Sequence, residues 1–444
     1  MITRSRTRSR GTAALATVAA LSALMLAACT SAAPEPSGSS PAASPTTQEP
    51  PADAVSLTWA NDAAWHKAGQ DAVSELAGEK IGVKVKSEIF PTSEAFQAQV
   101  RSSLTTSSAF PVFDWWSGYQ MEPVAEAGAL MDITDLWQAA VADGRYPASL
   151  QELVSWDGVA YGFPKLVNYW VVFYNKHVFE DNGLQPPTTW AELEEISTTL
   201  KAKNIYPFGL SMQDSSWQSF IWFEEILIRT DPALYTGVLD GSIAYNDPRI
   251  VDALGVWADI LKAGWITPTG LLTNENTESK FQSGEYAMFL LGDWWSSSLT
   301  NIDMVPGEDF GVFVMPDISA QASSGLIVEV RPTLFSQNAQ NAAEARKLAE
   351  FLMTTEASTT LAEAMEVNSP NLQVAESTRP VHLRELSKTV ADGKYSLLPR
   401  YWEGTPTPVV NAVYPLLGKI IENPEDLSSI LDETQAAAKA AWPA

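Results

Sequence analysis

The alternation of strand-like and helix-like segments constrains the possible folds of this chain more than any other feature of its sequence. Strands are predicted where short apolar or alternating segments occur, at residues 55–60 (VSLTWA), 81–90 (IGVKVKSEIF) and 110–114 (FPVFD). Residues 70–77 have a helical pattern, and after Ser93, a predicted helix cap, apolar residues recur every four positions at Phe96, Val100 and Leu104. This order predicts an α/β lobe with a largely parallel sheet.

The same signals continue through the rest of the chain. Further strands are predicted within residues 168–179, 286–291, 310–316 and 325–336. The first of these strands ends in a predicted turn at Asn175 and Lys176. A capping box of Thr189 and Glu192 predicts a helix whose apolar face is Trp190, Leu193, Ile196 and Leu200. Asn341 is predicted to cap another helix.

The N-terminal residues predict export and a lipid anchor. Residues 1–28 combine four arginines with a short apolar segment, which is the layout of a signal peptide and is too short for a stable membrane span. Leu26-Ala27-Ala28-Cys29 resembles the bacterial lipobox, so Cys29 is the predicted site of lipid attachment. The alternative is cleavage elsewhere and a chance cysteine. Residues 29–54, rich in Pro, Ser and Ala, predict a disordered linker between the membrane and the folded body.

Composition excludes several classes of protein. Cys29 is the only cysteine, so no internal disulfide can form. With 28 basic and 53 acidic residues the formal net charge is −25, which disfavours nucleic acid and anionic lipid surfaces as partners. The three histidines, at 66, 177 and 382, lack metal-ligand spacing, and no metal or other cofactor is expected. About 390 of the 444 residues follow the linker, which suggests two lobes.

Three segments, taken together, resemble a known family. They are residues 157–195, 280–295 and 341–358. The first contains a Tyr-Gly-hydrophobic-Pro step, a Tyr-Asn-Lys triplet and a Pro-Pro-Thr-Thr-Trp helix start, and the second contains Ser-Gly, Ala-Met and Gly-Asp-Trp steps. With the lipobox, this pattern resembles the bacterial extracellular solute-binding proteins of the sugar-binding, maltose-binding-protein-like type. Such proteins are the capture subunits of ABC importers.

The resemblance implies a two-lobed periplasmic-binding-protein-like α/β fold of type II, with the ligand in a cleft between lobes joined by hinge segments. By that pattern, residues 55–162 plus 312–365 would form lobe 1, and residues 166–305 plus 370–440 would form lobe 2. Ligand that contacts both lobes would favour a closed form. The chain departs from the family at Pro111, where the usual following Asp is replaced by Val112 and the carboxylate appears at Asp114.

A sugar site should combine aromatic faces, which pack on the C–H groups of a pyranose, with polar side chains that meet its hydroxyls. Four places at the ends of predicted strands have this composition, and they supply the candidates Asn61, Asp62, Asp114, Trp116, Asn168, Tyr169, Asp293 and Trp294. The resemblance adds Trp217, Glu329 and Arg331, which fall where the family contacts its ligand. The polar and aromatic residues that follow the predicted strand 286–291, Asp293 to Ser296, are predicted to lie in a loop.

Each candidate also has a structural interpretation. In the adjacent pairs Trp115-Trp116 and Trp294-Trp295 one ring is expected in the core, and Trp116 and Trp294 are the favoured cleft residues. Tyr169 is slightly favoured over Trp170. Glu329 and Arg331 could instead form an ion pair with each other.

The function implied by the resemblance is that of a non-catalytic, monomeric carbohydrate receptor, most simply for an oligosaccharide. Its expected partners are the carbohydrate, the transmembrane permease subunits of an ABC importer, and the outer face of the cell membrane through the lipid. One alternative is a receptor for a polyol or a glycerol phosphodiester on the same fold. Another is a glycoside hydrolase with two carboxylates drawn from Asp114, Asp293 and Glu329.

Overall fold

The computed structural model describes residues 54–212, 216–322 and 325–443. The predicted signal peptide, Cys29 and the linker up to residue 53 therefore lie outside the described residues. As predicted, the described part is a mixed α/β structure. Its strands are β1 (Val55–Asn61), β2 (Val83–Ile89), β3 (Val112–Asp114), β4 (Ser155–Trp156), β5 (Val159–Ala160), β6 (Gly162–Asn175), β7 (Tyr206–Gly209), β8 (Tyr286–Gly292), β9 (Phe310–Phe313), β10 (Gly325–Phe335) and β11 (Ser396–Pro399).

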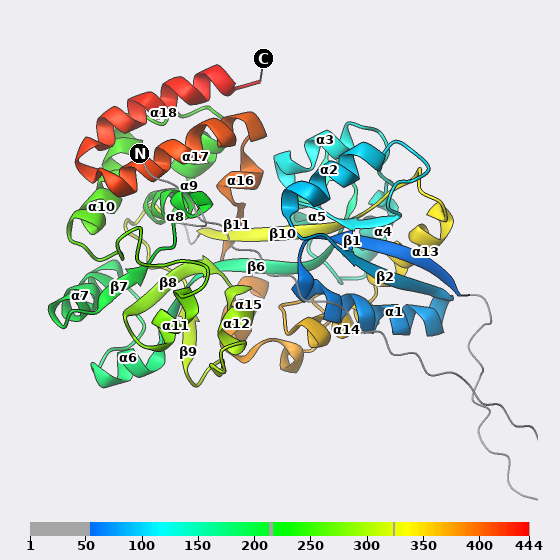
Figure 1. The fold of residues 1–444 in the computed structure, drawn as a ribbon, viewed down its shortest axis with the longest axis horizontal. Helices are drawn as coiled ribbons and strands as arrows, with labels where there is room; N and C mark the ends of the chain where they lie inside the picture. Colours follow the sequence, from blue (N-terminus) through cyan, green and yellow to red (C-terminus); the bar gives the residue numbers. More distant parts are fainter. Residues whose placement is uncertain (1–53, 213–215, 323–324, 444) are drawn as a thin grey trace, which may run out of the picture. The chain divides into compact units, whose positions relative to one another are not determined.

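Two long strands, β6 and β10, organise the sheet. The main strand order is β2-β1-β3-β10-β6-β8-β7, with β11 paired to β10 and β9 paired to β6. β1 is parallel to β2 and β3, whereas β10 is antiparallel to both β3 and β6. Beyond its pairing with β10, β6 continues as the antiparallel partner of β8 and β9. Figure 1 shows β6 and β10 passing between two groups of elements, so both groups share these strands.

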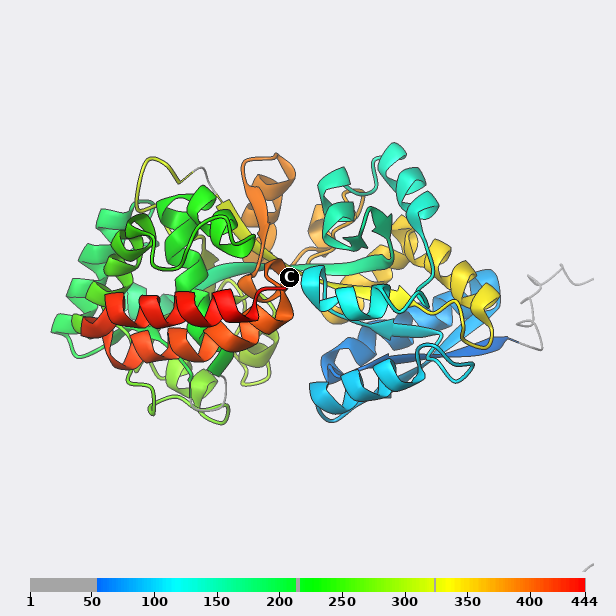
Figure 2. The same cartoon turned by 90° about the horizontal axis from the view of Figure 1, so that it is seen from above.

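Helices surround the sheet on both sides of these strands (Figure 2). Helix α1 packs on β2 and α14, and at the other end α17 packs on α18 and α8. The helices are α1 (Lys67–Ile81), α2 (Ser93–Ser103), α3 (Glu122–Ala125), α4 (Thr134–Ala142), α5 (Ala148–Leu153), α6 (Lys176–Asp181), α7 (Trp190–Ala202), α8 (Ser219–Thr230), α9 (Pro232–Leu239), α10 (Pro248–Lys262), α11 (Thr277–Gln282), α12 (Trp295–Thr300), α13 (Ala342–Leu352), α14 (Thr355–Met365), α15 (Arg384–Ala391), α16 (Tyr401–Gly404), α17 (Thr407–Glu422) and α18 (Leu427–Ala441). Within the ranges described, no helix is long and apolar enough to span a bilayer.

Most predicted elements are present, with three local differences. The cap of α2 is Thr92, whose side chain accepts a hydrogen bond from the Ala95 amide, and not Ser93. The segment after Asp293, predicted as a loop, forms the short helix α12. The capping box at Thr189 is present at the start of α7. Asn341 does precede α13, but in a left-handed conformation and without a side-chain cap.

The lobe boundaries expected from the sequence remain a proposal. β9 pairs with the edge of β6 opposite β8, at the same residues of β6, and α14 packs against α1. These contacts associate Phe310–Phe313 with the β6–β8 group and Thr355–Met365 with the β1–β2 group.

Candidate functional site

Five tryptophans and a phenylalanine line a cavity of about 450 Å³ beside β6 and β10. We call it the aromatic cavity, and its rings are Trp65, Trp116, Trp217, Phe220, Trp294 and Trp402. Trp65 follows β1, Trp116 follows β3 and Trp294 follows β8, so strand ends carry half of the set. The neighbouring rings of Trp115 and Trp295 are only 1% and 2% exposed and belong to the core.

Three charged side chains at the aromatic cavity, Glu329, Arg331 and Arg400, already have ion-pair partners. The Arg331 guanidinium lies over the Trp116 ring, 4.5 Å from its centroid, and forms an ion pair with Asp62. Glu329 lies 3.3 Å from Arg400, which also donates to Glu403 at 2.9 Å. Burial alone would lower the pKa of Arg400, but Glu329 and Glu403 outweigh it and raise that pKa. Glu329 and Arg331 therefore have separate partners and do not pair with each other.

A buried ion pair lies behind one wall of the aromatic cavity. Asp114 Oδ2 is bonded to Lys165 Nζ, and it lies 2.9 Å from His66 Nδ1. Asp114 Oδ1 accepts from Trp59 Nε1 at 2.9 Å and from Thr333 Oγ1 at 2.8 Å. Burial alone would raise the pKa of Asp114, but the Lys165 charge and the hydrogen bond with His66 together outweigh it and hold that pKa well below its usual range. Burial lowers the pKa of Lys165 to about 8.

His66 connects this ion pair to the cavity. Burial and the Lys165 charge lower the pKa of His66 to about 3, so the imidazole is neutral at physiological pH. Its Nδ1 lies 3.0 Å from Lys165 Nζ, and its buried Nε2 has no hydrogen-bond partner within the described protein. His66 lines the aromatic cavity, and its side chain has no exposed surface.

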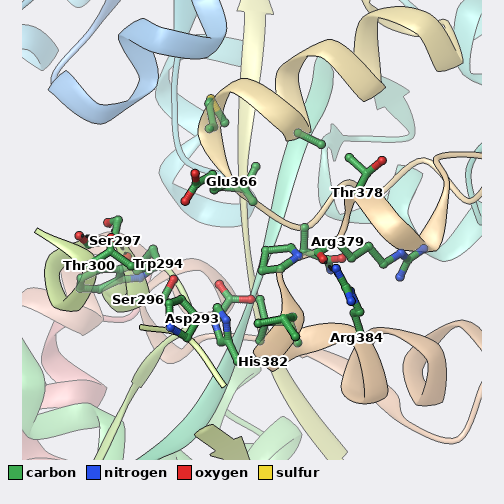
Figure 3. A pocket seen from close by; sticks show the side chains of 18 of the residues that line it. Asp293, Trp294, Ser296, Ser297, Thr300, Glu366, Thr378, Arg379, His382 and Arg384 are labelled. Atoms are coloured by element: carbon green, nitrogen blue, oxygen red, sulfur yellow. Dashed lines mark hydrogen bonds between the residues drawn. The ribbon is translucent and has the colours of Figure 1, made fainter. Parts of the chain in front are cut away.

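A second cavity, of about 490 Å³, adjoins the first, and we call it the polar cavity. The two cavities share Trp65, Asn168 and Trp294 in their linings. Figure 3 shows side chains converging on it from the end of β8, from α12, from the end of α14 and from residues 377–384. Asp293 is 4% exposed, and burial raises its pKa well above the usual range.

The structure brings most of the predicted site residues to these cavities. Six of them line the aromatic cavity: Trp116, Asn168, Trp217, Trp294, Glu329 and Arg331. Asp293 lines the polar cavity, and Asp62 lies behind Arg331 as its ion-pair partner. Trp116, Trp217 and Trp294 thus share one cavity, as the sugar-site hypothesis requires.

Besides Asp62, three predicted residues lie outside both linings. Asp114 is fully buried by its ion pair with Lys165. Asn61 accepts from the Ala63 amide at 2.9 Å and donates to Gln70 at 3.1 Å, so it shapes the turn after β1. Tyr169 lies on a different cavity, and burial raises its pKa to about 12. In this structure these residues support the site from behind.

Sequence reasoning missed several residues of the aromatic cavity. They are Trp65, His66, Ser93, Glu94, Gln97, Leu166, Phe220, Arg400 and Trp402. The only signal for Arg400 and Trp402 was an Arg-Tyr-Trp sequence in a region without a clear strand pattern. Within the described ranges, no group of three or more His, Cys, Asp or Glu side chains is placed to hold a metal ion.

Comparisons with known proteins agree with this architecture. Residues 59–359 match the family of bacterial extracellular solute-binding proteins. An uncharacterized ABC transporter extracellular-binding protein of Pyrococcus horikoshii is 26% identical over 46% of this chain and 46% of its own length. The sn-glycerol-3-phosphate-binding periplasmic protein of Brucella abortus is 26% identical over 50% of this chain and 55% of its own length. The chain therefore spans about half the length of these curated relatives.

Among solved structures, the bacterial solute receptor AcbH has a similar fold. Its TM-score is 0.74 at 19% sequence identity, covering 88% of this chain and 100% of that chain. AcbH is described as having an exclusive substrate preference for β-D-galactopyranose. At this level of identity the similarity shows the fold alone, which is that of the type II periplasmic binding proteins.

Proposed function

Because this chain belongs to the family of bacterial extracellular solute-binding proteins, we propose that it is the receptor of an ABC importer and captures a carbohydrate outside the membrane. The observation that carries this proposal is the aromatic cavity, where Trp116, Trp217 and Trp294 surround one space. Aromatic faces pack on the C–H face of a pyranose, and the paired charges beside them accept and donate to its hydroxyls. The AcbH preference for a pyranose supports the same ligand class.

A phosphorylated solute is the main alternative, since one relative is a glycerol-3-phosphate-binding protein. Phosphate groups are usually held by free guanidinium groups or by helix N-termini. Both arginines of the aromatic cavity are instead neutralised, Arg331 by Asp62 and Arg400 by Glu329 and Glu403. This pairing favours an uncharged ligand.

We further propose that the protein has no hydrolase activity. Of the carboxylates that could serve a glycosidase, Asp114 is buried against Lys165 and Glu329 is paired with Arg400. Asp293 faces the neighbouring polar cavity. Incubation with oligosaccharides should therefore give stoichiometric binding without product, and a released sugar would contradict the proposal.

The proposed place of action is the outer face of the cell membrane, through a lipid on Cys29, with the permease as protein partner and the receptor itself a monomer. In cell fractionation, Cys29→Ala should move the protein from the membrane fraction to the soluble extracellular fraction. Ser31→Ala is the matched control and should leave it in the membrane fraction. A membrane-bound Cys29→Ala variant would contradict the lipid anchor.

The ligand class is tested by a thermal-shift screen followed by calorimetry. D-galactose, D-glucose, lactose, maltose and sn-glycerol-3-phosphate are compared on the wild type and on Trp217→Ala. A carbohydrate that binds should raise the melting temperature by mass action. Trp217→Ala should weaken the binding of that carbohydrate at least tenfold. Trp190→Ala, which removes a half-buried ring outside both cavities, is the control. Binding of only the phosphate ester would favour the alternative.

A further inference from the structure

We propose that the polar cavity is the second half of the same binding site and holds a neutral polyhydroxylated unit, covalently joined to the sugar ring in the aromatic cavity. This inference rests on the proposed carbohydrate-binding function and specifies its ligand. The ligand would thus have two chemically different parts, of which only one lies against tryptophan rings.

Continuity between the cavities is the first argument. Trp294 and Trp65 belong to both linings, and so does Asn168 between them on β6. With volumes of about 490 and 450 Å³, each cavity is within the size range of a complete small-molecule site. A single ring cannot fill both, whereas two linked units could occupy one cavity each.

The second argument is a set of buried polar atoms that have no partner within the described protein. Asp293 Oδ2 is such an atom, and its residue is 4% exposed. Asn368 is 2% exposed, and its Oδ1 accepts from Ser387 Oγ at 3.0 Å while its Nδ2 is unpartnered. Both ring nitrogens of His382 are also unpartnered. Leaving such buried atoms unpaired is unfavourable, so a ligand that forms hydrogen bonds with them gains affinity.

The charged groups that line the polar cavity define the chemistry of the unit proposed to bind there. The polar cavity is lined by the carboxyl groups of Asp293, Glu363 and Glu366 and by the guanidinium groups of Arg379 and Arg384. Arg384 Nε donates to the Arg379 carbonyl at 3.1 Å, and this bond holds the loop that carries Arg379. Burial lowers the pKa of His382 to about 4, so it adds no charge. The lining carries both signs of charge and both donors and acceptors, which suits a ligand with hydroxyl groups.

Aromatic faces are scarce in the polar cavity. Besides His382, the rings that line it within the described residues are the two tryptophans it shares with the aromatic cavity. The second unit must therefore be recognised by its hydroxyls and not by stacking. A closed sugar ring and an open-chain polyol both have this chemistry.

Calorimetry with matched ligands tests the inference on the full chain. D-galactose is compared with lactose and lactitol, and D-glucose with maltose and maltitol. A two-unit ligand should bind the wild type at least tenfold more tightly than its single ring. Asp293→Ala should reduce that advantage about tenfold, the effect of one lost hydrogen bond to a buried group, without changing single-ring affinity. The alditols show whether the second unit is a ring or an open chain.

A second variant tests the inference at an exposed position, because Asp293→Ala changes a buried residue and can disturb folding. Ser297 is an exposed residue of α12 that lines only the polar cavity, so Ser297→Trp should block that cavity and abolish the two-unit advantage. Asn301→Trp, at the exposed end of the same helix and outside both cavities, should leave the two-unit advantage unchanged. Equal single-ring and two-unit affinities, or an unchanged advantage in Ser297→Trp, would overturn the inference alone. No binding of any of these sugars would overturn the proposed function and the inference with it.

Discussion

His66 shows how one buried side chain links stability to the site. Its imidazole is neutral because burial and the neighbouring Lys165 lower its pKa to about 3. In the unfolded chain a histidine titrates near its ordinary pKa of about 6.5. Between these values the unfolded chain binds a proton that the folded protein does not, so the free energy of unfolding falls as the pH falls from 6.5 towards 3.

This sign gives a prediction for His66→Gln, which replaces the imidazole with a neutral amide. The wild type should lose roughly 3 kcal/mol of stability through this group between pH 6.5 and 4. The variant should lose less over the same range, although His382, with a lowered pKa of about 4, retains a part of the effect. Melting temperatures measured at several pH values check this, and parallel curves for the two proteins would contradict it.

The extent to which the site could be predicted depended on how local each signal is. One ring of each adjacent tryptophan pair could be assigned to the core because successive residues point in opposite directions at a strand end. Asp114 could not be placed, because its partner Lys165 is 51 residues away and only the folded chain brings the two together. Arg400 and Trp402 were missed for the same reason, since they reach the cavity from a separate part of the chain.

Among the helices, α7 has the clearest local signal. Thr189 Oγ1 accepts from the Glu192 amide at 3.3 Å, and Glu192 Oε2 accepts from the Thr189 amide at 3.1 Å. Thr189→Ala removes one of these bonds and should lower the free energy of unfolding by about 1 kcal/mol, measured by denaturant titration. Thr198→Ala, the same change at an exposed position inside α7, is the control and should be neutral or slightly stabilising. Equal losses in both variants would count against a capping role.

Elements were predicted well where apolar periodicity or a cap is written into a short segment, as in β1, β2 and α7. The cap of α2 was misplaced by one residue because Thr92 and Ser93 are both good caps in sequence. In the structure, the Ser93 hydroxyl donates to Asp62 instead. The short helix α12 was predicted as a loop because serines and tryptophans are weak helix formers, and tertiary packing of Trp295 in the core decides the outcome.

In the protein as a whole, a close approach joins segments that are far apart in the chain. Gly118 has φ 56°, and a Cβ there would overlap the carbonyl oxygen of Glu403 in α16. Beside it, Gln120 Nε2 donates to the Trp402 carbonyl at 3.3 Å and to Thr407 Oγ1 at 3.1 Å. This contact places the segment after β3 against the segment that carries Arg400 and Trp402 to the aromatic cavity.

Gly118→Ala should therefore keep the two segments apart. We expect weaker ligand binding and, in small-angle scattering with ligand, a larger radius of gyration than that of the wild type. Gly128→Ala is a matched control, because Gly128 has φ 64° but no atom within 4 Å of an added Cβ. It tests the backbone strain of the left-handed region without the contact. Wild-type affinity and dimensions in Gly118→Ala would contradict a role for this approach in binding.

The pairing of each arginine at the aromatic cavity with a carboxylate has a consequence for the surroundings in which the protein works. The chain carries a formal net charge of −25, so its long-range field varies strongly with dissolved electrolyte. An uncharged solute that meets only internally compensated ion pairs does not respond to that field. Capture should be as effective in a saline medium as in a dilute one, while the same acidity keeps the protein dispersed in both.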